Sequence, residues 1–516
     1  MGLSSSGGGR HRCACAGEGT GGDGGTGVDG NSCGRWLQRR MSDHADTRDE
    51  SAWSRLAKGL ALSLGFVGDA YDLFVVNLVI KNLEQVYEQT GWDASHASLV
   101  ASAALVGTLV GQLSFGMLAD RFGRRPLFIL CAFLTCCGSA LSALSSRLRS
   151  LSPWPLVIQL VLFRLLLGVG IGGEYPLSAT VAFETSKRPP GEAATSVLGV
   201  FCMQGVGLVL CPVVYLILLA SHMPQTLTWR IALFIGALPS LLAFVLRFRL
   251  HESDEYENVT TTARNRVSSA TRVVRDDTIA SHSWTLFGTA SAWFLLDVTF
   301  YANALAQSQV TDLAGVTSSL HSDCIQALQM ALLALPGYAL SYMFAVRLGV
   351  RNVQMAGFAL LAVLYTVLAL FWPTLKTWFT LLYGLTFLFS NFGPNATTFC
   401  LAAMVFPTQI RSTCHGISAA AGKAGALIGA AALRPIALAA GLEAVFGCCA
   451  TISLVGAVIT ALFIPVPVAP VAQFGALHHE LPFEGPPQSP NHANTGKEMQ
   501  QFQDTDISSW SAESAR

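Results

Sequence analysis

Residues 111–125 read Gly111-Gln-Leu-Ser-Phe-Gly116-Met-Leu-Ala-Asp120-Arg-Phe-Gly123-Arg124-Arg125, an apolar helix end followed by a basic turn. The glycines of this stretch permit close contact with a second helix, as in many membrane helix pairs. Asp120 can pair with an arginine of the turn or meet the positive end of a facing helix. We therefore predict that this stretch closes one side of a helical bundle. The predicted gate comprises Asp120, Arg121, Gly123, Arg124, Arg125 and, from a later apolar segment, Arg164.

Apolar runs long enough to cross a membrane recur on both sides of this stretch. Of the 516 residues, 52% are hydrophobic and 12% are charged, and the mean hydropathy is +0.47. About 20 apolar residues are needed to cross a hydrocarbon core of ~30 Å. We therefore predict an all-α, integral multi-pass membrane protein embedded in a lipid bilayer. Its twelve transmembrane helices are expected at 56–80, 97–119, 127–146, 156–182, 194–220, 229–248, 285–310, 324–346, 353–372, 376–400, 412–436 and 441–464.

The basic residues lie mainly in the connections that follow even-numbered spans. Connections rich in Lys and Arg stay on the cytoplasmic side of a membrane, so we expect both termini to be cytoplasmic. The formal net charge is +0, which gives no indication of a nucleic-acid partner. The basic residues assigned to these connections are Arg121, Arg124, Arg125, Lys187, Arg188, Arg247, Arg249, Arg264, Arg266, Arg272, Arg275, Arg347, Arg351 and Arg411.

Polar segments divide the chain into five parts. We expect disordered tails at 1–54 and 465–516, six-helix bundles at 55–248 and 285–464, and a cytoplasmic linker at 249–284. Residues 1–50 lack the apolar stretch of a secretory signal, and translation could instead begin at Met41. Cys13, Cys15 and Cys33 lack the spacing of zinc ligands, so no metal or other cofactor is expected.

Two aspartates interrupt the first span. An ionisable side chain at the centre of a spanning helix costs about 2.5–3.5 kcal/mol, so such residues are candidates for function. Asp69 and Asp72 are three residues apart and therefore lie on one helix face. Because two ionised carboxylates would repel, one of the two is expected to hold a proton. An ion pair with Arg164 is the alternative.

The fourth span contains Gly172-Gly173-Glu174-Tyr175-Pro176. Pro176 lacks a backbone N–H, and we expect it to break the helix where it lines a cavity. Tyr175 can then donate its hydroxyl to a ligand, while Glu174 can bind and release a proton. A packing kink alone would explain the glycines and the proline but not Glu174.

The seventh span carries Trp293, Asp297 and Tyr301 at intervals of four, which places them on one helix face. Lys423 in the eleventh span supplies a positive charge, and we expect Asp297 to face it across the two halves. An oxyanion such as phosphate requires a cation and several hydrogen-bond donors. The donors available are Lys423, Tyr175, Tyr301, Trp293, Gln204 and Asn395.

A degenerate copy of the gate sequence, Arg347-Leu-Gly349-Val-Arg351, lies at the equivalent position of the second half and lacks the aspartate. Repeated six-span units with this motif resemble the major facilitator superfamily, which implies two six-helix bundles and a site at the membrane midplane. The strings Asp-Ala-Tyr-Asp-Leu-Phe, Gly-Gly-Glu-Tyr-Pro-Leu-Ser-Ala-Thr, Asn-Phe-Gly-Pro-Asn-Ala-Thr-Thr-Phe and Arg-Ser-Thr-Cys-His-Gly-Ile-Ser-Ala further resemble proton-coupled phosphate symporters of fungi and plants.

This resemblance implies proton handling at Asp69, Asp72 and Asp297. Two positions depart from the family pattern, with Glu174 at a usual aspartate and Cys131 near a usual glutamate. The phosphate contacts that the resemblance implies are Tyr175, Gln204, Trp293, Asp297, Tyr301, Asn395 and Lys423.

The expected function is therefore symport of inorganic phosphate with protons by alternating access, by a monomer in the plasma membrane. A transporter of another small anion or of an organic solute is one alternative, and a phosphate-binding nutrient receptor is another. The sequence does not combine a nucleophile, a base and an orienting group in a recognisable arrangement, so we do not expect an enzyme.

Overall fold

A computed structural model describes residues 52–147, 152–186, 190–258, 260–261, 279–305, 319–375 and 378–466. The predicted tails, with Met41 and the three N-terminal cysteines, lie almost entirely outside these ranges. Most of the predicted linker, with Arg264, Arg266, Arg272 and Arg275, lies outside them as well, as does the pair Lys187 and Arg188. Within the described part of the chain, every regular element is a helix.

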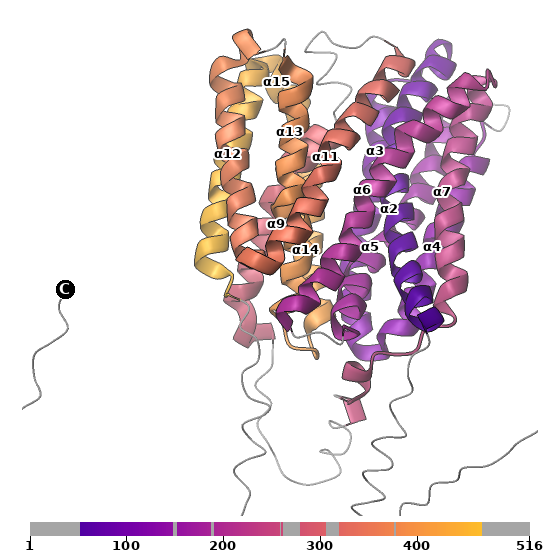
Figure 1. The fold of residues 1–516 in the computed structure, drawn as a ribbon. Coiled ribbons are helices and arrows are strands. Elements are labelled where there is room, and N and C mark those ends of the chain that lie inside the picture. The colour runs from indigo at the N-terminus through magenta and orange to yellow at the C-terminus, as the bar shows by residue number, and fades with distance from the viewer. Residues whose placement is uncertain are drawn as a thin grey trace, which may run out of the picture. The chain divides into compact units, whose positions relative to one another are not determined.

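Six helices form the N-terminal bundle, coloured indigo to magenta in Figure 1. In it α2 packs against α6 and α7, while α5 packs against α3 and α4. The short 3-10 helix Glu88–Thr90 follows α2. The helices are α2 Ala52–Tyr87, α3 Ala94–Phe122, α4 Arg124–Leu144, α5 Trp154–Glu184, α6 Pro190–Ala220 and α7 Gln225–Arg247.

Local sequence explains where α3 begins and ends. The Asp93 carboxylate accepts hydrogen bonds from the backbone N–H groups of Ser95 and His96, at 2.9 and 3.0 Å, and caps the helix. Gly123 ends α3 with φ of 95°, which glycine adopts without steric penalty, and α4 follows directly. The basic turn predicted from the sequence is therefore a tight helix-to-helix turn.

The C-terminal bundle contains the remaining helices, coloured from pink through orange to yellow in Figure 1. The 3-10 helix Ile279–His282 precedes α9, and non-helical backbone at Gly441 divides α15 into two spans. Here α9 and α12 both pack against α15, and α11 packs against α13. The helices are α9 Ser283–Leu305, α11 Leu320–Leu348, α12 Val350–Leu375, α13 Phe379–Phe392, α14 Pro394–Met404 and α15 Arg411–Phe463.

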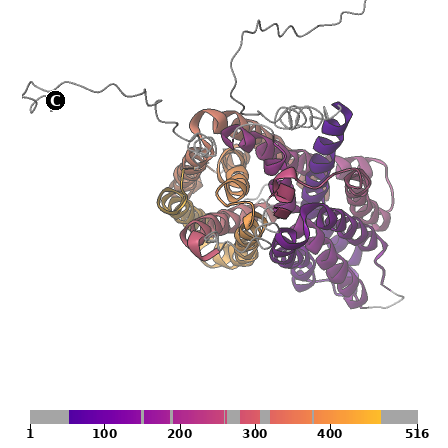
Figure 2. The same ribbon diagram turned by 90° about the horizontal axis from the view of Figure 1, so that it is seen from below.

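The described helices account for twelve membrane spans. Ten segments are long and apolar enough to cross a membrane. α9 and the consecutive helices α13 and α14 supply the other two. Seen from below, the spans form two neighbouring groups, one from each half of the chain (Figure 2). Contacts of α3 with α15, and of α6 with α11 and α14, join the groups. The predicted fold class, twelve helices in two bundles, is confirmed.

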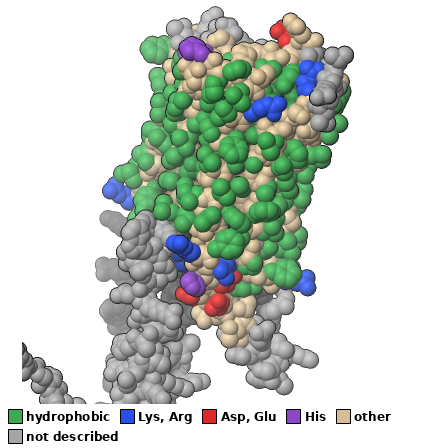
Figure 3. Space-filling model, turned by 90° about the vertical axis from the view of Figure 1, so that its right-hand side faces the viewer, with side chains coloured by type: hydrophobic (Ala, Val, Ile, Leu, Met, Phe, Trp, Pro, Cys, Tyr) green, Lys and Arg blue, Asp and Glu red, His purple; other side chains and the backbone are tan. Residues whose placement is uncertain are grey.

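The outer surface is apolar. Figure 3 shows hydrophobic side chains over the middle of one face and charged side chains near its two ends. Large apolar side chains are exposed elsewhere as well, including Ile217 at 63% and Leu462 at 71%. Apolar exposure on this scale is unfavourable in water and suits a lipid environment. The chain is therefore an integral multi-pass membrane protein.

The predicted helix break at Pro176 is wrong. α5 continues through Pro176, because the loss of one N–H is compatible with a helix whose glycines pack tightly against neighbouring backbone. The break falls in the tenth span, where Gly393 has φ of −110° and ψ of −108° between α13 and α14. Pro394 disfavours helical geometry in the preceding residue, and glycine at that position tolerates the alternative.

Arg247 also differs from the prediction, which assigned it to a basic connection. It lies in the last turn of α7 and its side chain is 0% exposed. The connection therefore begins later than the charge pattern indicated.

Gly107 and Gly111 of α3 determine how closely α3 and α5 approach, because a Cβ on either would collide with the backbone of α5. A Cβ on Gly111 would collide with the backbone of Val169 and Gly172, whereas a Cβ on Gly199 of α6 would meet nothing within 4 Å. We predict that Gly111→Ala destabilises the protein by about 1–3 kcal/mol through overpacking. Gly199→Ala is the matched control and should leave stability unchanged or slightly increased. Thermal unfolding in detergent measures both, and equal unfolding temperatures for the two variants would contradict this account of the α3–α5 contact.

Candidate functional site

A buried ion pair joins α9 and α15, two helices of the C-terminal bundle. Lys423 Nζ on α15 donates hydrogen bonds to Asp297 Oδ2 at 2.8 Å and to the Tyr301 hydroxyl at 3.0 Å, both on α9. Lys423 and Asp297 are each 1% exposed. A charge buried in a medium of low dielectric constant requires a partner, and here each charge has one.

Aromatic rings surround this ion pair. The ring centroids of Tyr301 and of Tyr175, which lies on α5, are 4.4 and 5.3 Å from Lys423 Nζ. The Trp293 ring on α9 lies 6.4 Å from the Tyr175 ring. Gly422 makes room for Trp293, because a Cβ at this position would collide with the indole. The spacing of four along α9 brings Trp293, Asp297 and Tyr301 to one side of the helix.

An amide network from the other helices adjoins the aromatic rings. Gln204 Oε1 on α6 accepts hydrogen bonds from Asn395 Nδ2 and from the Tyr338 hydroxyl, each at 3.2 Å. Asn395 also donates to Asn391 Oδ1 at 2.7 Å. The helix break at Gly393 separates these two asparagines and places Asn395 in the first turn of α14.

The pairing of Asp297 with Lys423 corrects one expectation. The two residues do not face each other across the halves, because α9 and α15 belong to the same bundle and pack against each other. From the N-terminal half, Tyr175 approaches the ion pair and Gln204 reaches Asn395. The predicted contact residues thus form a cluster between the bundles, with its cation and acid on one side.

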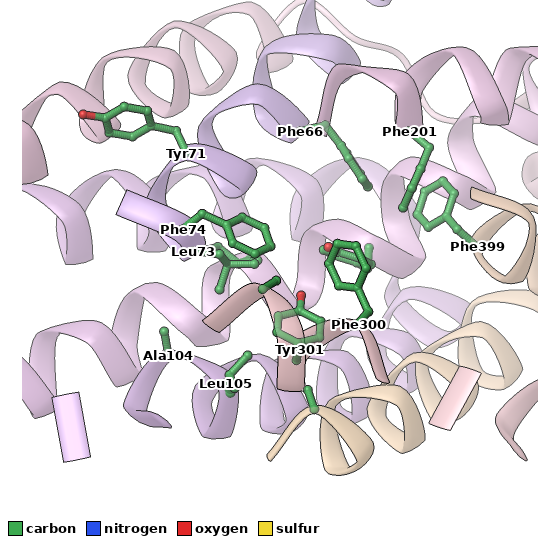
Figure 4. Close-up of a cluster of buried hydrophobic side chains, with 14 of the residues drawn as sticks. Phe66, Tyr71, Leu73, Phe74, Ala104, Leu105, Phe201, Phe300, Tyr301 and Phe399 are labelled. Carbon is green, nitrogen blue, oxygen red and sulfur yellow. The ribbon is translucent and has the colours of Figure 1, made fainter. Parts of the chain in front are cut away.

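Two aromatic groups flank the cluster. Figure 4 shows Phe74, Phe300 and Tyr301 beside one another, and Phe66, Phe201 and Phe399 as a second group. The Phe74 ring stacks on Tyr301 at 6.0 Å, whereas Phe66 and Phe201 both contact Phe399.

A cavity lies beyond the first aromatic group. Side chains near the end of α2 and the start of α11 line it, together with Phe74, Phe300 and Phe387. We name this end of the protein the cavity face. The aromatic rings therefore separate the cavity from the ion pair.

Asp69 and Asp72 lie inside the N-terminal bundle. Asp72 Oδ1 accepts a hydrogen bond from Ser139 Oγ at 2.9 Å, and Gly236 of α7 leaves space for this carboxylate. Arg164 Nη2 donates to the backbone carbonyl of Asp72 at 2.8 Å rather than to its carboxylate. Asp69 Oδ2 is buried without a hydrogen-bond partner in the described part of the chain.

Glu174 forms a second buried ion pair. Arg247 on α7 donates to both carboxylate oxygens of Glu174, with Nη1 at 2.7 Å from Oε2. Both side chains are buried. Cys131 of α4 also lies near Glu174. Its sulfur is so close to Gly173, the residue before Glu174, that a Cβ on this glycine would collide with it.

The predicted gate lies at the end of the protein opposite to the cavity. We name this end the Asp120 face. The Asp120 carboxylate accepts hydrogen bonds from the backbone N–H groups of Ser412 and Thr413, at 3.3 and 2.8 Å. These groups form the first turn of α15, whose positive end favours a carboxylate. Arg124 Nη2 is 3.3 Å from Asp120 Oδ1. Arg164 is not part of this group, since it contacts α2 near Asp72.

A wider charge network at the Asp120 face links both halves and the linker. Glu184 Oε1 accepts hydrogen bonds from Arg124 and Arg411, at 2.9 and 3.0 Å. Arg411 also pairs with Glu255 at 3.1 Å. The Glu252 carboxylate accepts from the backbone N–H groups of Arg124 and Arg125, while the Arg121 side chain is exposed beside Phe122.

Sequence reasoning missed the acids of this network. Glu184 ends an apolar span and Glu252 and Glu255 begin the linker, positions at which acids are ordinarily solvated. The excess of basic residues on this face is the signal that could have indicated buried acidic partners. In the described ranges, no group of three or more His, Cys, Asp or Glu side chains is placed to hold a metal ion.

We predict that Asp120→Asn loosens the Asp120 face, because a neutral amide interacts less favourably with the start of α15 and with Arg124. The reporter is a Thr180→Cys substitution in a chain whose native cysteines are replaced. Thr180 is buried, and its hydroxyl lies 3.2 Å from that of Ser412. A water-soluble maleimide should label this cysteine several-fold faster in Asp120→Asn, at roughly the 2–10-fold expected for about 1 kcal/mol. Asp254→Asn, at an exposed linker position, is the control, and equal labelling rates would contradict the prediction.

Comparison of the sequence with known proteins identifies the family of this chain. Residues 60–468 match the model of the "Sugar (and other) transporter" family. The chain is 35% identical over 477 residues to "Probable inorganic phosphate transporter 1-6" of Arabidopsis thaliana, which covers 80% of this chain and 91% of that protein. It is 33% identical over 444 residues to "Low affinity inorganic phosphate transporter 4" of Petunia hybrida, covering 73% and 83%.

Solved structures show the same fold at lower identity. The proton:xylose symporter XylE with bound 6-bromo-6-deoxy-D-glucose superposes with a TM-score of 0.66 at 18% identity, covering 80% of this chain and 96% of that one. The human organic anion transporter MFSD10 superposes with a TM-score of 0.58 at 16% identity, covering 78% and 99%. The chain therefore belongs to the sugar (and other) transporter family, is a relative of the plant inorganic phosphate transporters, and shares the fold of a major facilitator symporter.

Proposed function

We propose that this protein is a secondary active transporter that carries inorganic phosphate together with protons across a membrane by alternating access. The observation that supports this most directly is the Lys423 ammonium, which is buried between the two bundles among hydroxyl, indole and amide groups. The names of the plant relatives support phosphate as the substrate. The substrate contacts proposed are Tyr175, Gln204, Trp293, Asp297, Tyr301, Asn395 and Lys423.

The pairing of Lys423 with Asp297 explains why a proton would accompany the anion. Phosphate that binds Lys423 lies beside the Asp297 carboxylate, and two like charges 4 Å apart repel by about 4 kcal/mol at an effective dielectric constant of 20. Protonation of Asp297 removes this repulsion and permits binding. Loss of the proton on the other side of the membrane restores the repulsion and expels phosphate. Asp69 and Asp72 are proposed as further proton sites on the N-terminal side.

The two ends of the protein support an alternating-access cycle. The charge network closes the Asp120 face, whereas the cavity lies toward the other end and reaches the Phe74 and Phe300 rings. The excess of arginines supports a cytoplasmic position for the Asp120 face, with both termini on that side of the membrane. Phosphate then approaches through the cavity from outside. We propose that Asp120, Gly123, Arg124 and Arg125 form the inner gate of a monomer in the plasma membrane.

Uptake into proteoliposomes tests this function. Purified protein should accumulate labelled phosphate only when a proton gradient is imposed, and excess arsenate should compete. Excess xylose should not compete, although proteins of the same fold carry it. Uptake of an organic anion or of xylose without phosphate uptake would favour the alternative of another solute. Phosphate binding without any flux would favour a nutrient receptor.

We predict that Asp297→Asn separates binding from proton coupling. The amide is permanently neutral, so phosphate should still bind Lys423 and exchange with phosphate on the other side. Accumulation should fall by roughly tenfold or more and cease to depend on the proton gradient, since one protonatable group contributes several kcal/mol to release. Proton-dependent uptake at the wild-type rate in Asp297→Asn would refute this role for Asp297.

Lys423→Gln should abolish both uptake and exchange, because the anion loses its cation. Asp254→Asn, at the exposed linker position, is the matched control for charge loss and should transport normally. A Lys423→Gln variant that folds and exchanges phosphate normally would show that the anion binds elsewhere.

A further inference from the structure

The ion pair of Glu174 and Arg247 lies within the N-terminal bundle, apart from the cluster around Lys423. Both terminal nitrogens of Arg247 make a further contact, since Nη1 also donates to the Phe128 carbonyl at 3.0 Å and Nη2 to the Ala61 carbonyl at 3.2 Å. Its guanidinium lies 3.6 Å from the centroid of the Phe128 ring. These contacts hold Arg247 against α2 and α4 as well as against Glu174 on α5.

The neighbouring helix is shaped to accept this pair. A Cβ on Gly65 of α2 would collide with Arg247 Nη2 and with Glu174 Oε1. Only a residue without a side chain lets α2 approach both charged groups at this point. The two-point contact between a guanidinium and a carboxylate is also the strongest ion-pair geometry available to these side chains.

Two other ionisable groups face Glu174. Asp69 of α2 lies one turn after Gly65 and interacts electrostatically with both Glu174 and Arg247. Cys131 of α4 interacts with the same two groups. Tyr175, the next residue of α5, points instead to the cluster around Lys423, and its ring centroid lies 5.3 Å from Lys423 Nζ.

We propose that Arg247 is a positioning residue, the permanent counter-ion of Glu174, and that the pair fixes the α5 segment carrying Tyr175 while taking no part in proton transfer. This inference rests on the proposed function, and it replaces the expectation that Glu174 carries a coupled proton. Asp69 is then the carboxylate of this group that exchanges protons.

Charge conservation supports this assignment. An arginine does not lose its proton in proteins, so protonation of Glu174 would leave Arg247 as an uncompensated buried cation. Protonation of Asp69 leaves no such charge, because no ion pair contains Asp69 in the described residues and its Oδ2 lacks a hydrogen-bond partner. A proton therefore binds more favourably to Asp69 than to Glu174.

A double-mutant cycle tests the proposal. Glu174→Gln and Arg247→Gln each leave one buried charge unpaired and should lower the phosphate uptake rate by roughly tenfold or more, with lower unfolding temperatures. The double variant Glu174→Gln/Arg247→Gln contains no charge at this position and can form an amide–amide hydrogen bond. It should recover most of the lost stability and at least about a third of the wild-type uptake rate, because replacing both charged residues leaves no unpaired charge in the bundle.

Proton coupling distinguishes a positioning role from a merely structural one and from proton transfer. The double variant should keep the wild-type pH profile of uptake and the wild-type number of protons per phosphate. Arg247→Gln alone should change the pH profile, because Glu174 then becomes an unpaired carboxylate that can titrate. A double variant with fewer protons per phosphate, or with a flattened pH profile, would show that Glu174 carries a coupled proton and would overturn the proposal.

The other buried pair is the matched control. Asp297→Asn/Lys423→Gln also removes both charges, yet it should not recover uptake, since these residues belong to the proposed substrate site. If the wild-type protein takes up no phosphate, the proposed function fails. Two measurements then test the inference without transport. One is the set of unfolding temperatures in the double-mutant cycle, and the other is the infrared band of protonated Glu174, compared between wild type and the double variant across pH. A protonated Glu174 in the wild-type protein would overturn it.

Discussion

The need to compensate buried charge governs the interior of this protein. Within a medium of low dielectric constant, an isolated ammonium or carboxylate is strongly unfavourable, so each must have a partner or be neutral. Lys423 satisfies this constraint with Asp297 and Tyr301 on α9. The same constraint makes the site responsive, because any anion that takes the place of Asp297 at Lys423 alters the charge balance of that carboxylate.

The two buried ion pairs have similar chemistry but different surroundings, and we propose different roles for them. Lys423 and Asp297 lie between the bundles, beside aromatic and amide groups, and in the proposed cycle a small anion exchanges with the carboxylate. Glu174 and Arg247 lie inside one bundle, with the arginine also bound to two carbonyls and a ring. The first pair therefore borders both bundles, whereas the second is enclosed within one bundle. Tyr175 connects the two, since it follows Glu174 and contacts Lys423.

Sequence patterns predicted the spans, the two bundles and the shared face of Trp293, Asp297 and Tyr301, because apolar length and the spacing of four along α9 are local properties. They could not assign partners between distant helices. Arg247 was counted as a loop residue, Asp297 was expected to face Lys423 across the halves, and Arg164 was included in the gate. The helix break was expected at Pro176 rather than at Gly393. Each correction depends on which helix lies opposite, and spacing along one helix does not contain that information.

The central claim is that Lys423 holds phosphate. Phosphate-dependent thermal unfolding of the purified protein in detergent tests it most directly, without requiring transport. Phosphate at about 100 times its dissociation constant should stabilise the wild-type protein by about 2.7 kcal/mol, and arsenate should act similarly. Lys423→Gln, if folded, should show no such stabilisation. Equal stabilisation of Lys423→Gln and wild type by phosphate would contradict the account.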